Sequence, residues 1–227
     1  MNRDERRSRE SALPLAIVDL TNRRAMFPRE PEGGTWISAN DAGVCMALIN
    51  WHRIEHAPVR SMTSRGQVVR KLGGNSSTGE IAAAVAALPL DRLRPFRLIA
   101  IIPSERSVTE WRWNLDRLST CNHAWKSRHW FSSGYDEAKA ERERRKICAG
   151  AEEQKSAGSL DWLRRLHRSH LPERGPFSIC MHRLDAATVS YTELTVSGRR
   201  ATMRYKPGPC CSNQAITIKT ISLARGL

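Results

Sequence analysis

The clearest pattern in the chain is a pair of apolar runs separated by turn residues. Residues 35–39 and 44–49 are rich in strand-forming residues, and residues 40–43 between them are of turn type. The second run is apolar at every position, which is typical of a strand inside a sheet. We therefore predict a β-hairpin whose second strand is central and buried.

Helical spacing of apolar residues predicts two amphipathic helices. Ser77 and Glu80 form a capping-box pattern before the first helix, and Ser159 precedes the second. The positions expected on the inward face of the second helix are Leu160, Leu163 and Leu166. A further helix is predicted over residues 136–156, where the many charges indicate a solvent-facing surface.

The remaining pattern predicts more strands and few other elements. Residues 11–32 are interrupted by prolines and are interpreted as a loop with one short strand at 15–20. Other strands are predicted at 96–103, 109–114, 188–196 and 200–205. Neighbouring strands in antiparallel pairs, with the helices segregated, indicate an α+β fold and not a doubly wound one. We expect one domain over residues 1–209 and an irregular tail over 210–227.

Composition narrows the function classes. With 227 residues, 40% of them hydrophobic, the chain can bury a sizeable core. The net charge of +14 suggests nucleic-acid binding, but seven of the 37 basic residues are lysine and the other 30 are arginines spread along the whole chain. Such a charge indicates nonspecific association more than a dedicated nucleic-acid function, so we do not expect one.

The six cysteines form no CxxC pair, and no apolar leader or long apolar span is visible. A protein of this size does not depend on disulfides for a stable core. We expect a reduced, cytoplasmic protein without a membrane span.

The histidines and cysteines between residues 167 and 211 are the candidate metal ligands of the sequence. His167 and His170 have a spacing that suits a metal ion, but no carboxylate or thiol near them in the sequence completes a set. Cys180 and His182 alternate along one short stretch and are interpreted as buried structural residues. The thiol pair at 210–211 has no histidine near it in the sequence. The sequence therefore predicts no metal site.

The chain begins with four polar residues. These are Asn2, Arg3, Asp4 and Glu5. An arginine can bind an anion with two hydrogen bonds, and a carboxylate can hold a proton. A solvated, frayed terminus is the structural alternative.

Two asparagines are candidates for binding an oxyanion. Asn50 ends the predicted buried strand, and Asn122 lies within the segment at 119–125. A carboxamide N–H can stabilise a developing negative charge without reorganising. The alternative is an asparagine that only begins a turn.

Taken in order, these segments resemble the NRDE family, which is named for the residues at positions 2–5 and includes the transport and Golgi organisation protein two. The segments that carry the resemblance after residues 2–5 are GGTW at 33–36, GVCMALIN at 43–50, SRG at 64–66 and STCNHAW at 119–125. Their order and rough spacing agree with the family over residues 2–205.

The resemblance implies the N-terminal-nucleophile hydrolase fold, a four-layer αββα sandwich of two mainly antiparallel sheets. Related bile-salt and penicillin V hydrolases cleave amide bonds with an N-terminal cysteine, whose own α-amine is the base. In this chain the resemblance implies that Arg3 and Asp4 flank the nucleophile, with Asn2 and Glu5 beside them. Asn50 and Asn122 would hold the carbonyl oxygen.

The chain also departs from the family pattern. In the family a cysteine follows the initiator methionine, on a strand before the four polar residues, whereas here Met1 directly precedes Asn2. We therefore expect a fold lacking its first strand, and no catalysis by this mechanism in the form given. A misplaced start site that trims the protein would explain this, and a degenerate paralogue is the alternative.

Two functions follow from the resemblance. The first is an N-terminal-nucleophile-type amidohydrolase or acyltransferase, which binds a small amide or acyl compound and uses no cofactor. The alternative is a non-catalytic protein that binds or traffics haem or lipid.

Overall fold

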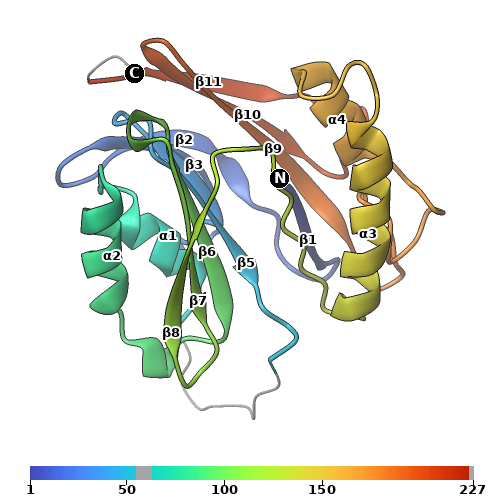
Figure 1. Cartoon of the computed structure of the whole chain (residues 1–227), viewed down its shortest axis with the longest axis horizontal. Helices are drawn as coiled ribbons and strands as arrows, with labels where there is room; N and C mark the ends of the chain where they lie inside the picture. The colour runs from blue at the N-terminus through green and yellow to red at the C-terminus, as the bar shows by residue number, and fades with distance from the viewer. Residues whose placement is uncertain (55–62, 225–227) are drawn as a thin grey trace. The chain divides into compact units, whose positions relative to one another are not determined.

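The computed structural model describes residues 1–54 and 63–224 and shows two sheets with helices (Figure 1). The chain divides into two compact units that interleave in the sequence. The first unit comprises Met1–Ser11, Lys126–Thr192 and Tyr205–Ile216. The second comprises Ala12–Trp125, Glu193–Arg204 and the residues from Thr217 onward. The single-domain boundary at residue 209 stays a prediction.

The larger sheet belongs to the second unit and has the strand order β2-β3-β4-β5-β6-β7-β8, each strand antiparallel to the next. Its strands are β2 (Leu13–Asp19), β3 (Arg24–Arg29), β4 (Ile37–Asn40), β5 (Cys45–Asn50), β6 (Phe96–Ile102), β7 (Ser107–Trp113) and β8 (Leu118–His123). The predicted hairpin forms as β4 and β5, and β5 lies between two strands as expected.

Two helices, α1 (Gly66–Leu72) and α2 (Thr78–Ala86), cover one face of this sheet (Figure 1). Short 3-10 turns follow at Leu90–Arg92 and Pro103–Glu105. The Ser77 hydroxyl accepts a hydrogen bond from the Glu80 N–H at 3.2 Å, so the predicted cap of α2 is confirmed. The core under the helices is built from Val69, Leu72, Ile81, Val85, Leu98 and Trp111, among others.

The smaller sheet has the order β1-β9-β10-β11. Its strands are β1 (Asn2–Arg6), β9 (Ala186–Ser197), β10 (Arg200–Pro207) and β11 (Thr217–Ser222). The predicted hairpin at 188–205 forms as β9 and β10. β1 pairs antiparallel with β9, and an irregularity of the register between Arg3 and Asp4 leaves one residue of β9 without a partner in β1.

The helices of the first unit are α3 (Glu137–Glu152) and α4 (Leu160–Arg168). Both start where the sequence predicts, since Asp136 and Ser159 accept hydrogen bonds from backbone N–H groups of the first turn. Trp162 and Leu166 of α4 pack against Cys148 and Ala151 of α3. The expected inward position of Leu160 is wrong, because this side chain is 45% exposed and Trp162 fills the core instead.

Two segments expected to be irregular form strands. Arg24–Arg29 becomes β3 although it contains Pro28, because β3 pairs with β4 only at Ala25 and Met26 and the proline lies beyond that pairing. Thr217–Ser222 becomes β11, so the prediction of an irregular tail is wrong there. Four of its six residues are β-branched threonine or isoleucine, which favours a strand.

Candidate functional site

The six candidate residues from the sequence lie in different units. Asn2, Arg3, Asp4 and Glu5 form most of β1 in the first unit. Asn50 ends β5 and Asn122 lies in β8, both in the second unit. The structure therefore places four of the candidate residues together on β1 and the two asparagines in the other unit.

β1 presents its side chains on two faces, since successive residues of a strand point to opposite sides. Arg3 and Glu5 share one face, and their side chains approach to 3.5 Å. Asn2 and Asp4 share the other face, where they contact the helical part of the first unit. The polar start of the chain is thus an ordered strand, and the alternative of a frayed terminus is wrong.

Asn2 joins β1 to the end of α4 and to the segment before β9. Its Nδ2 donates to the carbonyl oxygens of His167 at 3.0 Å and Ile179 at 2.8 Å. Its Oδ1 lies 3.1 Å from Nδ1 of His167. Burial lowers the pKa of His167 well below its usual value, so the ring is neutral at pH 7 and its Nδ1–H donates to Asn2.

Asp4 is held by a cation and a hydroxyl. Its Oδ2 lies 3.2 Å from Nη2 of Arg144 in α3, and its Oδ1 accepts a hydrogen bond from the Thr188 hydroxyl at 2.6 Å. Burial raises the pKa of Asp4, and the opposing effects of Arg144 and Thr188 do not cancel it. The group therefore holds a proton at higher pH than an ordinary aspartate.

Arg3 is the buried cation of the other face. It is 9% exposed, and Glu5 holds its guanidinium from one side. Glu5 is shared with Arg9, whose Nη1 lies 2.9 Å from the same carboxylate oxygen, but Arg9 is 44% exposed. A buried guanidinium positioned by a carboxylate can recognise a planar acceptor with two hydrogen bonds.

The two asparagines of the second unit have different surroundings. Asn50 is half-buried at the end of β5, opposite Phe96. Asn122 is exposed, and its Oδ1 accepts a hydrogen bond from the Thr109 hydroxyl at 3.1 Å. Their roles in holding a carbonyl oxygen stay predictions.

The second unit contains an ionic cluster that the sequence did not reveal. Glu110 of β7 is fully buried and lies 2.5 Å from Arg97, 2.8 Å from Arg112 and 2.7 Å from His123. Burial raises its pKa, but the hydrogen bonds from these partners outweigh that effect and bring it to about 2. Only the register of β6, β7 and β8 brings these residues together, so no pattern within one strand could have found the cluster.

The first unit contains a second unexpected cluster, of His170, Cys180, His182 and Cys211. His182 Nε2 lies 3.5 Å from the sulfur of Cys211, and thiols lie beside both histidines. In the fold, the cysteine pair therefore has a histidine neighbour and His170 has thiol neighbours, which their separation in the sequence did not predict. The ligand atoms come from three segments, whose proximity the sequence does not show.

The family of the chain follows from its sequence. A family model described as Transport and Golgi organisation 2 matches residues 1–157, more than half of the chain. The chain belongs to this family. The predicted resemblance is thus confirmed, and the match includes all six candidate residues, whereas the histidine–cysteine cluster lies outside it. No curated protein matches the chain.

Solved structures show the fold of this member of the Transport and Golgi organisation 2 family. A variant of the conjugated bile acid hydrolase from Clostridium perfringens matches with a TM-score of 0.50 and 9% identity, over 96% of this chain and 88% of that one. A second variant of that hydrolase has a TM-score of 0.49 at 10% identity, over 97% and 83% of the chains. The first match and the two antiparallel sheets confirm the predicted α+β fold of the N-terminal-nucleophile hydrolases.

The helices of this family member differ from membrane spans in length or polarity. Among the described residues, every helix is too short or too polar to cross a bilayer. This agrees with the sequence, which predicted no membrane-spanning segment.

Proposed function

We propose that this chain binds a small amide or acyl compound, in the manner of the N-terminal-nucleophile hydrolases, and that Arg3 holds the polar end of the compound. The observation that carries the proposal is the placement of Arg3, a buried arginine fixed by Glu5 on an ordered strand. A fixed guanidinium loses little entropy when it forms two hydrogen bonds to a carbonyl or carboxylate.

The other face of β1 supports this role for Arg3. Asn2 and Asp4 anchor the strand to α3, α4, β9 and the segment before β9 through five hydrogen bonds. A binding residue is most effective when its backbone is fixed by surrounding contacts. Asn2 and Asp4 are therefore positioning residues in this proposal, and Arg3 is the residue that touches the ligand.

Fold and family favour amide or acyl chemistry for the ligand. The solved structure with a TM-score of 0.50 is, by its name, a hydrolase of conjugated bile acid. We propose by analogy that the carboxamides of Asn50 and Asn122 act as hydrogen-bond donors to a carbonyl oxygen. This part of the proposal rests on the family resemblance of residues 43–50 and 119–125.

N-acylglycines of increasing chain length test the proposal, because each carries one amide and one carboxylate. Calorimetry with the full chain should show saturable binding. Arg3→Leu should weaken binding about 10-fold or more, since a charge-assisted hydrogen bond contributes about 1.5–3 kcal/mol. Arg3→Lys should recover part of the loss, because the charge stays but the planar fork is lost.

Arg9→Leu is the matched control, since Arg9 pairs with the same Glu5 but is exposed. It should bind the N-acylglycines like the unmodified chain. Equal losses in Arg3→Leu and Arg9→Leu, or no saturable binding at all, would contradict the proposal. A haem titration tests the alternative function: a Soret shift at one equivalent, without N-acylglycine binding, would favour haem binding.

A further inference from the structure

We infer that His170, Cys180, His182 and Cys211 form a structural zinc site in the first unit. All four residues belong to that unit, so the site depends on no arrangement of one unit against the other. The observations behind it are separate from those behind the proposed amide binding. The inference rests on the donor atoms, their separations and the way the backbone holds them.

The separations fit a tetrahedral zinc ion. Zinc bonds of about 2.0–2.1 Å to nitrogen and 2.3 Å to sulfur require edges of about 3.3 Å between two nitrogens and about 3.5 Å between nitrogen and sulfur. The Nε2 atoms of His170 and His182 lie 3.2 Å apart. The sulfurs of Cys180 and Cys211 lie 3.6 Å and 3.5 Å from Nε2 of His182.

All four donor atoms lie within 4.8 Å of one another. Four atoms at such distances can surround one ion without a large movement. Two nitrogens and two sulfurs in this arrangement favour zinc, since magnesium and calcium prefer oxygen ligands. Four protein ligands also fill the coordination shell, which is typical of structural zinc and leaves no position for a substrate.

The backbone holds the ligands in place. The N–H of Cys180 donates to the carbonyl of Ser169, the neighbour of His170, at 3.0 Å. The N–H of His182 donates to the carbonyl of Gly175 at 3.2 Å, and the Ser178 hydroxyl donates to the carbonyl of Cys180 at 2.7 Å. The segment that carries two ligands is therefore fixed beside the third.

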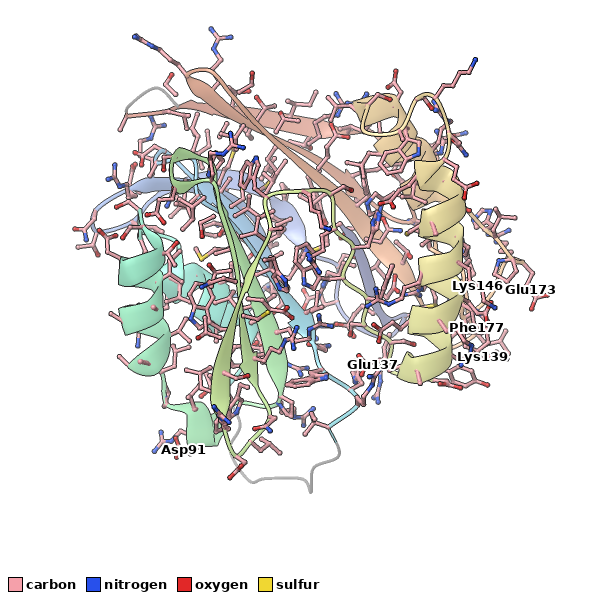
Figure 2. The ribbon with its side chains drawn as sticks, in the orientation of Figure 1. Asp91, Glu137, Lys139, Lys146, Glu173 and Phe177 are labelled. Atoms are coloured by element: carbon pink, nitrogen blue, oxygen red, sulfur yellow. The ribbon has the colours of Figure 1, made fainter. Side chains whose placement is uncertain are left out.

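This segment is also anchored to α3. Figure 2 shows Phe177 beside Lys139, whose Nζ lies 4.4 Å from the centre of the ring. Arg144 donates to the carbonyl of Ser178 at 3.1 Å. Contacts with α3 thus fix the residues just before Cys180 without a bound metal.

The surroundings suit a site protected from water. Cys180 is fully buried and packs with Tyr191 and Cys210, and the other three ligands are half-buried. Arg174 Nη2 lies 3.5 Å from Nδ1 of His182, close enough to offset thiolate charge. With zinc on Nε2, the Nδ1 atom carries the proton, so this arginine contributes charge and no hydrogen bond.

Zinc at this place would also fix the contacts of Asn2. Ile179, which accepts a hydrogen bond from Asn2, precedes Cys180 directly. The thiol of Cys210, the neighbour of Cys211, donates to the carbonyl of His167 at 2.6 Å, and that carbonyl also accepts from Asn2. The metal would therefore link three segments: the residues after α4, the segment before β9 and the turn after β10.

Zinc content and affinity test the inference on the full chain. Reduced protein should contain about one zinc per chain by mass spectrometry of the metal, and Co²⁺ substitution should give the visible bands of tetrahedral thiolate coordination. The double change Cys180→Ser with Cys211→Ser should weaken zinc binding about 100-fold or more in competition with a chromophoric chelator. EDTA should lower the melting temperature of the unmodified chain and leave that of the double variant unchanged.

Matched controls separate loss of a ligand from loss of the fold. Cys148→Ser removes a buried thiol of α3, and His129→Ala removes a histidine of the same unit that pairs with Glu152. Both should keep one zinc. His170→Cys should also keep it, because four ligands remain, whereas His170→Ala should lose affinity with an unchanged circular dichroism spectrum.

Three outcomes would overturn the inference. One is a reduced protein that binds no stoichiometric zinc. Another is a double cysteine variant that binds zinc like the unmodified chain. The third is a disulfide between Cys180 and either neighbouring thiol in protein purified without reductant, shown by a count below six thiols in the denatured chain.

Discussion

Asp4 in the first unit and Glu110 in the second are both carboxylates held by arginine, but their pKa values move in opposite directions. For Asp4, burial raises the pKa, and one guanidinium from Arg144 with the hydroxyl of Thr188 does not compensate. The folded protein therefore binds a proton at Asp4 more readily than the unfolded chain does.

Glu110 is buried more completely, yet its pKa falls to about 2. Burial alone would raise the pKa, but Arg112, Arg97 and His123 all donate to the carboxylate and outweigh it. The two groups differ in their donors: three side chains donate to Glu110, whereas one guanidinium and one hydroxyl donate to Asp4.

Removing Arg144 should have the largest effect. Its guanidinium donates to the carbonyls of Ser178 and Ser132 and to Asp4, and only 6% of the residue is exposed. Arg144→Met should lower the free energy of unfolding by about 3–5 kcal/mol in urea denaturation, because buried acceptors lose their donor. Arg145→Met, next to it but exposed, is the control and should change stability by less than about 0.5 kcal/mol.

Glu110→Gln should have the next largest effect. From an ordinary pKa of 4.5 to about 2, the ionised carboxylate stabilises the folded protein by about 3 kcal/mol at pH 7. Because the folded pKa is the lower one, this stabilisation is present above about pH 4.5 and is lost as the pH falls toward 2. Urea denaturation at pH 7, 4 and 3 should show the gap between the two proteins closing.

Glu152→Gln is the control for this measurement, since Glu152 pairs with His129 but is 45% exposed. Its cost should stay below about 1 kcal/mol. A gap for Glu110→Gln that stays constant from pH 7 to pH 3 would show that folding does not lower the pKa of Glu110.

Asp4→Asn should show the opposite dependence on pH. Above the ordinary value of 3.8 the unfolded chain loses the proton first, so the folded protein binds more protons and its stability falls as the pH rises. The asparagine variant cannot titrate. Its stability relative to the unmodified chain should therefore increase as the pH rises above about 4. A gap that moves in the other direction would place Asp4 in the same class as Glu110.

The sequence predicted the elements whose signals are local. Ser77, Asp136 and Ser159 begin helices because a cap needs only the next three residues, and the hairpin of β4 and β5 needs only its own turn. Pro28 was misleading because the pairing of its strand depends on β2 and β4, which lie outside the segment. The tertiary arrangement of the sheets came from the family resemblance and not from periodicity.

The candidate site divides in the same way. Residues 2–5 stood out because four adjacent polar residues are unusual at the start of a strand, and the structure orders all of them. Glu110 was missed, and the four histidine and cysteine residues were not predicted to form one cluster, since their partners lie on other strands or up to 41 residues away. A cluster cannot be predicted from local sequence patterns when each strand or segment contributes one or two of its residues.

The smallest predicted effects come from removing the caps of α2 in the second unit and α4 in the first. Ser77 and Ser159 each accept one N–H of the first turn, at 3.2 Å and 3.1 Å. In α2 the carboxylate of Glu80 also accepts the N–H of Ser76 at 2.7 Å, a contact that a change at Ser77 leaves in place. The corresponding position of α4 is Trp162, which offers no such acceptor.

Ser159→Ala should therefore cost about 1 kcal/mol of unfolding free energy, and Ser77→Ala about 0.5 kcal/mol. Urea denaturation at pH 7 measures both, and the matching changes to aspartate should restore most of each loss because a carboxylate also caps a helix. Equal costs at the two serines would show that the reciprocal contact of Glu80 contributes nothing. In that case the two units would differ in their buried ion pairs but not in how their helices begin.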